Sequence, residues 1–400
     1  MSFRSSRKSI TTTTTEQAAE RFSLTEPGNI YTRITNPTTS ILEERLNLLE
    51  GGVGALATAS GSAAVTYAIQ NIASSGDHIV SASSVYGGTF NLFAHTLPEF
   101  GITTTFVDSN DLNALKDAIQ SNTKAIFLES IGNPDSNLID LTAICDIAHA
   151  VNVPVIVDNT FATPYLFKPF DFGADITVYS TTKFIGGHGV SIGGAIIDSG
   201  KFDWTNGKFP KLTEPDLSYH GLSWINAAGK DAYITRARTV LLHDTGAAPS
   251  PFNSWTILLG LETLSLRLER HVENAEKIAD FLYNHPKVAW VNYPKLPGNR
   301  YASLAEKYFK KGVGSVFTFG LKDGAEASKK LCAATNIFSI VANVGDAKSL
   351  IIHPASTTHS QLSEEELDRT GIKPETIRLS VGIETIDDLI NDLDHALSTI

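Results

Sequence analysis

Two short segments in the middle of the chain carry the groups that could do chemistry. A β-branched run ends on Asp158, and Thr160 follows two residues later. Such a run predicts a buried parallel strand that delivers its carboxylate to the C-terminal edge of a sheet, where open α/β sheets keep their sites. Lys183 follows in the same half of the chain, among hydroxyl groups and glycines, with Ser180 and Thr182 directly upstream.

These side chains match the needs of one cofactor. A lysine amine can form a Schiff base, hydroxyl and backbone N–H groups can hold a phosphate, and a carboxylate can pair with a pyridinium nitrogen. Together these are the groups that pyridoxal 5'-phosphate (PLP) requires of a protein. Each group alone has an ordinary explanation, because most lysines are exposed charges. Their order and their neighbours favour a PLP site.

With these residues in this order, the chain resembles the cystathionine γ-synthase-like family of PLP enzymes in cysteine and methionine metabolism, from about Glu16 to Ile400. The resemblance implies an α/β fold of PLP fold type I, with a mostly parallel, seven-stranded sheet domain and a smaller C-terminal α/β domain. We expect an N-terminal arm over residues 1–45, a PLP-binding domain over 46–250 and a C-terminal domain over 251–400.

Further candidates lie at the ends of predicted strands and the starts of predicted helices. Gly61 and Ser62 lie at a small-residue turn into a helix, whose N-terminus can bind a phosphate; close packing at a Gly-rich turn is the alternative. Tyr86 follows a predicted strand and is otherwise a core aromatic with its hydroxyl at the surface. Asn133 precedes Pro134 after another strand, which an ordinary turn would also explain.

The resemblance assigns roles to these residues. It implies that PLP is bound by Gly61, Ser62, Tyr86, Asn133, Asp158, Thr160, Ser180, Thr182 and Lys183. It makes Lys183 the catalytic lysine and Tyr86 a catalytic residue that stacks on the cofactor ring. Tyr31 and Arg33 would reach the phosphate in a neighbouring subunit, which implies a homo-oligomer, expected to be a homotetramer of dimers that share active sites.

Arg378 and Asn343 are the predicted substrate residues. An arginine inside an apolar strand is costly without an anionic partner, and its planar fork fits a carboxylate. A salt bridge with Glu384 is the structural alternative. By resemblance, Arg378 and the Asn343 loop bind the α-carboxylate of an amino-acid substrate.

Two segments separate the branches of the family. Gly88 stands where the methionine γ-lyases typically have cysteine, and the segment from Asn343 is more similar to the O-acetylhomoserine sulfhydrylases. The resemblance therefore implies a transferase of methionine biosynthesis that replaces the acetyl group of O-acetyl-L-homoserine with sulfide or a thiol. A methionine γ-lyase, an O-succinylhomoserine sulfhydrylase and a cystathionine γ-synthase are the alternatives, and an inactive PLP-binding scaffold is the alternative from another class.

Three elements are expected to position or cover these residues. Ser40 and Glu43 have the spacing of a capping box before a leucine-rich helix that ends at Gly51. A polar stretch over 201–221 predicts a surface loop. A long helix from near Ser254 is expected to link the two domains.

Composition agrees with a large enzyme that acts on small molecules. The 400 residues carry 32 basic and 43 acidic side chains, a net charge of −11, which argues against nucleic acid or an anionic membrane as the main partner. Cys145 and Cys332 are the only cysteines, which favours a reducing compartment, and we expect a cytoplasmic protein. No apolar run reaches the length of a membrane span.

Other site types find little support. His188, His353 and His359 lack the spacing of metal ligands, so no metal is predicted. The glycine-rich pieces do not form a dinucleotide-binding fingerprint. The first fifteen residues lack the apolar face of a transit helix, and by resemblance the N-terminal arm is shorter than is usual.

Overall fold

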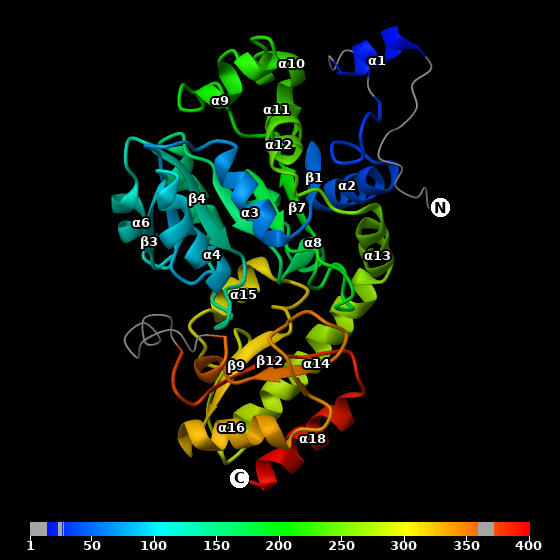
Figure 1. The fold of residues 1–400 in the computed structure, drawn as a ribbon. Helices are drawn as coiled ribbons and strands as arrows, with labels where there is room; N and C mark the ends of the chain where they lie inside the picture. Colours follow the sequence, from blue (N-terminus) through cyan, green and yellow to red (C-terminus); the bar gives the residue numbers. More distant parts are fainter. Residues whose placement is uncertain (1–13, 23–25, 27, 359–371) are drawn as a thin grey trace.

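Two β-sheets organise the part of the chain that the computed structural model describes, residues 14–22, 26, 28–358 and 372–400 (Figure 1). The strands of the larger sheet come from residues 54–198, and those of the smaller sheet from residues 288–380. The predicted division of the chain near residue 250 stays a prediction.

The larger sheet has seven strands in the order β1-β7-β6-β5-β4-β2-β3. They are β1 (Gly54–Thr58), β2 (His78–Ala82), β3 (Thr103–Val107), β4 (Thr123–Glu129), β5 (Val155–Asp158), β6 (Ile176–Tyr179) and β7 (Gly194–Asp198). Strands β2 to β6 pair in parallel, whereas β7 runs antiparallel to both β6 and β1. The expectation of a mostly parallel seven-stranded sheet is confirmed.

Helices cover this sheet, and its strands other than β3 are almost entirely buried. Helix α3 packs on β6 and β7, and α11 packs on β1 and β7. The helices up to this point in the chain are α1 (Thr15–Phe22), α2 (Pro37–Glu50), α3 (Gly61–Gln70), α4 (Gly87–Asn91), α5 (Leu97–Glu99), α6 (Leu112–Ala118), α7 (Leu141–His149), α8 (Thr163–Leu166), α9 (Pro210–Thr213), α10 (Trp224–Ala228), α11 (Ala232–Arg236) and α12 (His243–Thr245). Short π- and 3₁₀-turns join them, among them Leu92–Thr96 and Ala237–Leu242.

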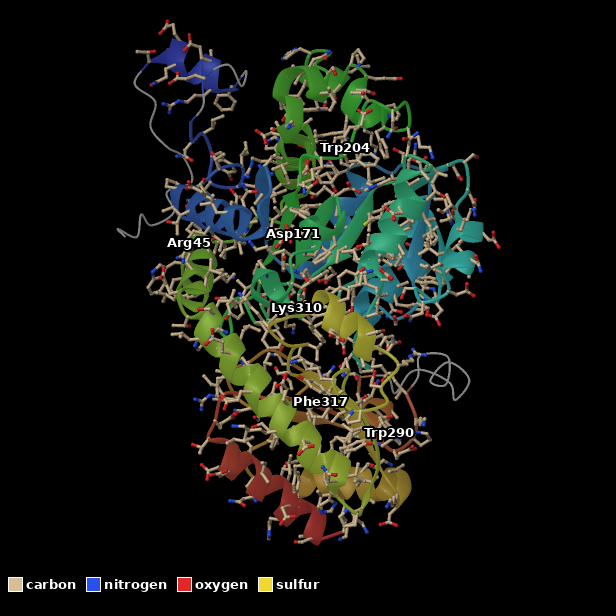
Figure 2. All side chains as sticks on the ribbon, turned by 180° about the vertical axis from the view of Figure 1, so that it is seen from behind. Arg45, Asp171, Trp204, Trp290, Lys310 and Phe317 are labelled. Atoms are coloured by element: carbon tan, nitrogen blue, oxygen red, sulfur yellow. The ribbon has the colours of Figure 1, made fainter. Side chains whose placement is uncertain are left out.

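The smaller sheet has five strands in the order β10-β11-β12-β9-β8. They are β8 (Val288–Asn292), β9 (Val316–Leu321), β10 (Ser339–Ile340), β11 (Leu350–Ile352) and β12 (Thr376–Ser380). The helices of this part are α13 (Pro251–Glu262), α14 (Leu264–Asn284), α15 (Ala302–Tyr308), α16 (Gly324–Ala334) and α18 (Ile386–Ser398). Helix α14 packs on β8, α16 packs on β9 and β12, and α18 contacts both helices. Phe317 on β9 is buried in this core (Figure 2).

The long linking helix is two helices. Helix α13 ends at Glu262 and α14 begins at Leu264, with Thr263 between them at φ −111° and ψ 13°. The side chain of Ser250 accepts a hydrogen bond from Asn253 N and caps the start of α13. The apolar periodicity runs through both helices, so it could not locate the break.

The predicted capping box is wrong. Helix α2 begins at Pro37, and the side chain of Asn36 caps it by accepting from Thr38 N. Glu43 is buried instead, where it accepts from Ala57 N at 2.8 Å and pairs with Arg238 at 2.9 Å. The predicted end of the helix is confirmed, because Gly51 follows it in the left-handed conformation at φ 84°.

The stretch over 201–221 is only partly a surface loop. Trp204 and Phe209 are 3% and 0% exposed, respectively, and their rings pack edge to face with centroids 5.0 Å apart. Trp204, labelled in Figure 2, also stacks on Tyr233 of α11. These aromatic residues form a small hydrophobic core that anchors the segment to the sheet domain. Because polar residues separate them in the sequence, the pattern did not predict this core.

Candidate active site

The carboxyl ends of three neighbouring strands form the floor of the candidate site. Asp158 ends β5 and Glu129 ends β4, and the two are paired in register. Residues paired in register on parallel strands point to the same face of the sheet, so two carboxyl groups lie side by side. Strand β6 ends one residue before Ser180, which leads into the turn that carries Lys183.

Lys183 contacts a residue of the second part of the chain. Its Nζ donates to Asn343 Oδ1 at 2.5 Å, and its backbone carbonyl accepts from Gly187 N at 2.7 Å. Burial lowers the pKa of the Lys183 amine, and the nearby charge of Arg378 lowers it further. Both effects favour the neutral amine, which is the nucleophilic and basic form.

Arg378 joins the same cluster from β12. It is 5% exposed, and it donates to Asn133 Oδ1 at 3.2 Å and to the Asn343 carbonyl at 3.3 Å. Burial lowers its pKa to about 10, so the group remains a cation at neutral pH. The alternative salt bridge is not formed, because Glu384 accepts from the backbone and side chain of Ser349 instead.

Asp158 is tied to the phosphate side of the site through Thr160. The Asp158 carboxylate accepts from Thr160 N at 3.0 Å and from the Thr160 hydroxyl, and the hydroxyl oxygen accepts from Ser180 N at 2.8 Å. Burial raises the pKa of Asp158 to about 6, although the two Thr160 bonds oppose the shift. The Thr182 hydroxyl is engaged with Gly193, donating to its carbonyl and accepting from its N–H.

The start of α3 offers unpaired N–H groups beside Ser180. The Ser60 side chain caps Ala63 N, which leaves the N–H groups of Gly61 and Ser62 without a helical acceptor. A Cβ atom at Gly61 would lie 2.6 Å from Cβ of Ser180. The glycine therefore keeps open a narrow cradle lined by N–H and hydroxyl groups, which suits a phosphate.

Tyr86 immediately precedes α4, and its ring is 52% exposed. A Cβ atom at Gly88 would lie 2.5 Å from Tyr86 Cε1, so only glycine allows this pose of the ring. The preceding residue, Gly87, has free space instead, because a Cβ atom there would meet no atom within 4 Å.

Glu129 is a site residue that the sequence reasoning passed over. Its carboxyl group accepts from Tyr86 N at 2.6 Å and from the backbone of Asn133. Burial raises its pKa well above the ordinary value, and the charge of Asp158 raises it further. The signal was present, because β4 is an apolar strand that ends on a carboxylate just as β5 does.

Arg267 of α14 was also missed, and it clamps the Lys183 turn. It donates to the carbonyls of Phe184 and Gly260 at 2.7 and 2.6 Å, and to Ile185 O at 3.3 Å. A Cβ atom at Gly187, where φ is 70°, would lie 2.0 Å from its guanidinium. Because carbonyl partners leave no pattern in the sequence, only the fold reveals the clamp.

Tyr31 and Arg33 lie elsewhere in the chain. The Arg33 guanidinium donates to the His243 carbonyl of α12 and lies 5.2 Å from the centre of the Tyr31 ring. The structure brings together Lys183, Asn343, Arg378 and Asn133, and it does not add Tyr31 or Arg33 to that group.

The histidines that were weighed as metal ligands have other partners. His188 Nδ1 bonds to Gly186 O, and His353 bonds to Ser356 and to Pro374 O; His359 lies outside the described residues. Within the described ranges, no cluster of three or more His, Cys, Asp or Glu side chains could hold a metal ion. In the same part of the chain, no helix is long and apolar enough to cross a membrane.

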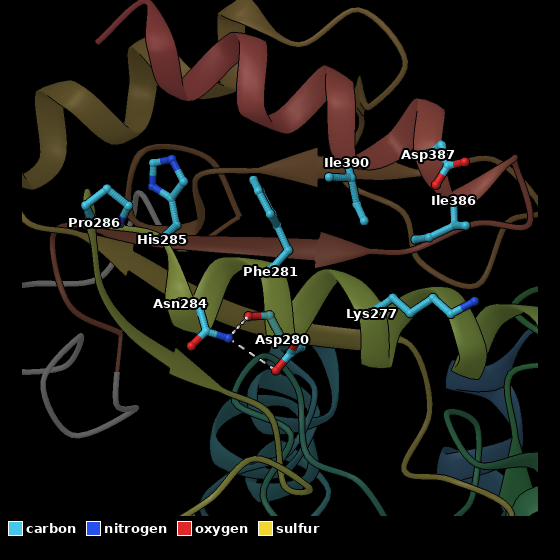
Figure 3. A pocket seen from close by; sticks show the side chains of 9 residues that line it. All are labelled: Lys277, Asp280, Phe281, Asn284, His285, Pro286, Ile386, Asp387 and Ile390. Carbon is cyan, nitrogen blue, oxygen red and sulfur yellow. Dashed lines mark hydrogen bonds between the residues drawn. The ribbon is translucent and has the colours of Figure 1, made fainter.

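A hollow of about 640 Å³ lies between α14 and α18, and Figure 3 shows its lining. Asn284 donates within α14 to Asp280, to its carbonyl at 2.9 Å and to Oδ1 at 3.3 Å. The other residues that line the hollow are Lys277, Phe281, His285, Pro286, Ile386, Asp387 and Ile390. None of the predicted site residues lines it, so we place the candidate site at the carboxyl edge of the larger sheet.

The residues of this edge fit PLP. The cradle at Gly61 and Ser180 offers N–H donors to a phosphate, Lys183 offers an amine whose neutral form is favoured, and Asp158 offers a carboxylate. This donor set serves three different parts of one molecule.

Comparisons with known proteins agree with this fit. The model of the Cys/Met metabolism PLP-dependent enzyme family matches residues 2–398. The chain is 50% identical over 395 residues to an O-acetyl-L-homoserine sulfhydrylase of Leptospira meyeri, covering 96% of this chain and 89% of the relative. It is 50% identical over 379 residues to a homocysteine synthase of Schizosaccharomyces pombe, covering 94% and 88%.

A solved structure is similar throughout. The Campylobacter jejuni protein named O-acetylhomoserine (thiol)-lyase, which carries a pyridoxyl-lysine phosphate, superposes with a TM-score of 0.95 at 45% identity. The match covers 98% of this chain and 94% of that protein. The expectation of a fold type I PLP enzyme is confirmed.

Proposed function

The chain belongs to the Cys/Met metabolism PLP-dependent enzymes, and we propose that it converts O-acetyl-L-homoserine and sulfide into L-homocysteine and acetate. The hydrogen bond from Lys183 Nζ to Asn343 Oδ1 at 2.5 Å carries the proposal. It joins the cofactor edge to the Asn343 and Arg378 cluster, which suits the carboxylate of an amino acid. Relatives with sulfhydrylase and homocysteine synthase names, each 50% identical, support the choice of substrate.

The residues divide the work of binding between the two ends of the site. Gly61, Ser62 and Ser180 would hold the phosphate of PLP, and Asp158 would keep the ring nitrogen protonated. PLP, when bound, supplies an electron sink for the negative charge that develops at the substrate Cα. Arg378 binds the α-carboxylate through its planar fork, which fixes Cα toward Lys183.

Lys183 moves the protons of the reaction. Its neutral amine accepts the Cα proton, because burial and Arg378 both disfavour the charged form. A Cβ proton is then removed, and the electrons of that C–H bond form a Cβ–Cγ double bond as the Cγ–O bond breaks and acetate leaves. Sulfide adds to Cγ with formation of a Cγ–S bond, and protons return to Cβ and Cα through Lys183. One hydrogen sulfide and one ester thus yield one thiol and one acetic acid. Tyr86 would cover the ring and assist the leaving group.

Product analysis tests the proposal. The holoenzyme is incubated with O-acetyl-L-homoserine with and without sulfide, and with O-succinyl-L-homoserine and methionine in parallel samples. Homocysteine formed only with sulfide, and with methionine left intact, is the expected result. Oxobutyrate and ammonia released from methionine would instead identify a γ-lyase. Faster turnover of O-succinyl-L-homoserine than of O-acetyl-L-homoserine would identify the succinyl ester as the preferred substrate.

The same site supports the proposal of a homo-oligomer, expected to be a homotetramer of dimers. By resemblance, Tyr31 and Arg33 reach the PLP phosphate of the adjacent subunit, and within its own chain Arg33 bonds to the His243 carbonyl, away from the Lys183 cluster. This fits a two-fold dimer in which each subunit supplies these residues to the site of the other.

Complementation between two inactive variants tests this sharing. Co-expressed Lys183→Ala and Arg33→Ala chains should recover about a quarter of the wild-type activity, because half the dimers are hybrids with one intact site. Each variant alone is the control. Hybrids that form but stay inactive would contradict a shared site.

The proposed compartment is the cytoplasm. Cys145 and Cys332 are buried free thiols, which suits a reducing environment. Fractionation of the native cell, followed by detection of the protein, tests this placement.

A further inference from the structure

The carboxyl group of Glu129 holds two site residues by their backbones. Tyr86 N donates to Glu129 Oε1 at 2.6 Å, and the backbone of Asn133 donates to the same carboxyl group. Tyr86 comes from the segment after β2, and Asn133 comes from the segment after β4. One buried side chain therefore binds the backbones of two loops at this edge.

The neighbours of Glu129 include the carboxylate assigned to the cofactor ring. Glu129 and Asp158 are register partners on β4 and β5, and Glu129 is 8% exposed. Asn133, which Glu129 holds, in turn accepts from Arg378 through its side chain at 3.2 Å. The contacts of Glu129 thus extend directly to Tyr86 and Asn133 and, through Asn133, to Arg378.

We propose that Glu129 is a positioning residue for the cofactor ring, which sets the Tyr86 ring and the Asn133 amide in place relative to Asp158 by binding their backbone N–H groups. Glu129 does this as a neutral acid, so that Asp158 remains the single anion of the edge. Two ionised carboxylates on adjacent strands would repel each other, whereas an acid carbonyl still accepts both N–H groups.

The charged and titratable groups around Glu129 are consistent with this role. Asp158 is the neighbouring group whose charge acts on it, and together with burial it raises the Glu129 pKa. The cations of the edge are Lys183 and Arg378; burial lowers the pKa of Lys183, and the charge of Arg378 lowers it further. Tyr86 faces Glu129 through its backbone N–H.

Two substitutions separate the acceptor from the charge. Glu129→Gln keeps a neutral carbonyl acceptor, and Glu129→Ala removes it. Asp198→Asn is the matched control, because Asp198 is a buried carboxyl group of the same sheet that accepts from Gly200 N at 2.8 Å, and its pKa is raised to about 7. Asp198 ends β7, which runs antiparallel to the strands that carry the site.

The measurement is PLP affinity, by reconstitution of the apo protein without any substrate. The alanine variant should bind PLP at least about tenfold more weakly, since buried N–H groups lose their acceptor. The glutamine variant should stay within about threefold of wild type, and Asp198→Asn should leave PLP affinity unchanged. Equal losses in both Glu129 variants would show that the charge is needed, and wild-type affinity in the alanine variant would show no role; either result overturns the proposal.

A second readout covers the case in which the alanine variant does not fold. The wild-type holoenzyme should lose PLP affinity as pH rises and Glu129 ionises, and its visible absorbance band should change with it. Glu129→Gln should lack this step. An unchanged step in the glutamine variant would overturn the neutral-acid role.

The inference rests on the proposed function only in taking this edge as the PLP site. Substrate-free binding keeps the two separable. Product analysis can fail while the Glu129 variants behave as expected, and the reverse can also occur.

Discussion

Asn343 is the residue through which the two sheets meet at the reactive amine. Its side-chain oxygen accepts from Lys183 Nζ, and its backbone carbonyl accepts from Arg378. A neutral amide satisfies the amine without favouring its charged form. The arrangement keeps Lys183 ready as a base while Arg378 remains charged for a carboxylate.

A carboxylate at position 343 should therefore shift the pH profile. In Asn343→Asp the new negative charge favours charged Lys183 and raises its pKa, so the acid limb of kcat should move by about one pH unit or more to higher pH. Steady-state kinetics across the pH range measures the limb. Asn343→Ser is the neutral control, and a profile in Asn343→Asp that overlays this control would contradict the argument.

Gly88 controls the pose of Tyr86. In Gly88→Ala the new Cβ atom falls 2.5 Å from Tyr86 Cε1, and the half-exposed ring must swing away. We expect kcat/KM to drop by about tenfold or more, since a 1 Å displacement of a positioning group has effects of this size. Gly87→Ala has open space at its Cβ atom and is the matched control. Equal activity in the two variants would remove Gly88 from the determinants of the site.

Among the elements, α14 is fastened to the Lys183 turn by Arg267. Its guanidinium gives three hydrogen bonds to carbonyl oxygens, and the peptide that follows the turn is fixed as well, because Ala347 N donates to Gly187 O at 2.8 Å. The turn that carries the amine is thus held from both the linking helix and the Asn343 segment.

Removal of this clamp should destabilise the fold. Arg267→Met leaves buried carbonyls unpaired and should lower the free energy of unfolding by about 3 kcal/mol or more. Arg267→Lys restores the charge without the planar fork and should recover part of the loss. Urea unfolding measures both. Arg270→Lys, on the exposed side of the same helix, is the control, and a Met variant as stable as this control would refute the clamp.

The parts of the fold that could be predicted are those specified by local pattern. The apolar run before Asp158 and the hydroxyl-rich turn of Lys183 both lie where the sequence places them, because a buried strand and its next loop are written in consecutive residues. Glu43 shows the opposite case. Its spacing from Ser40 indicated a cap, but partners 14 residues away and further decided its position.

Long-range contacts also explain why Arg267 was missed, whereas Glu129 had a local signal that was passed over. Arg267 binds backbone carbonyl groups, which every residue possesses, so the sequence does not indicate its partners. Lys183 and Asn343 are 160 positions apart in the chain, and only the family resemblance assigned both to one site in advance.

At the scale of the whole molecule, a buried acid beneath the sheet couples stability to pH. Glu50, at the end of α2, is 1% exposed and accepts from the hydroxyl of Tyr179 on β6 at 2.5 Å. Burial raises the Glu50 pKa from 4.5 to about 8. The native state therefore holds a proton that the unfolded chain releases above pH 4.5, and the stability from this group declines as pH rises from 4.5 to about 8.

Glu50→Gln should remove this decline. Relative to the variant, wild type should lose about 3–5 kcal/mol of stability across that pH window, with the glutamine protein the more stable at the alkaline end. Chemical denaturation at a series of pH values measures the difference. Glu306→Gln on exposed α15 is the control, and parallel pH curves for wild type and Glu50→Gln would contradict a buried neutral acid.

The position of β1 at the edge of the larger sheet delays its pairing during synthesis of the chain. Its one strand partner is β7, so about 140 residues must leave the ribosome after β1 before it can pair. At about 5–20 residues per second this wait lasts about 7 to 30 s. During that time β1, including Leu56, lacks its strand partner β7, and its neighbours in the chain, α2 and α3, can cover it in part. We therefore expect β1 to be most exposed to aggregation or chaperone binding until β7 emerges.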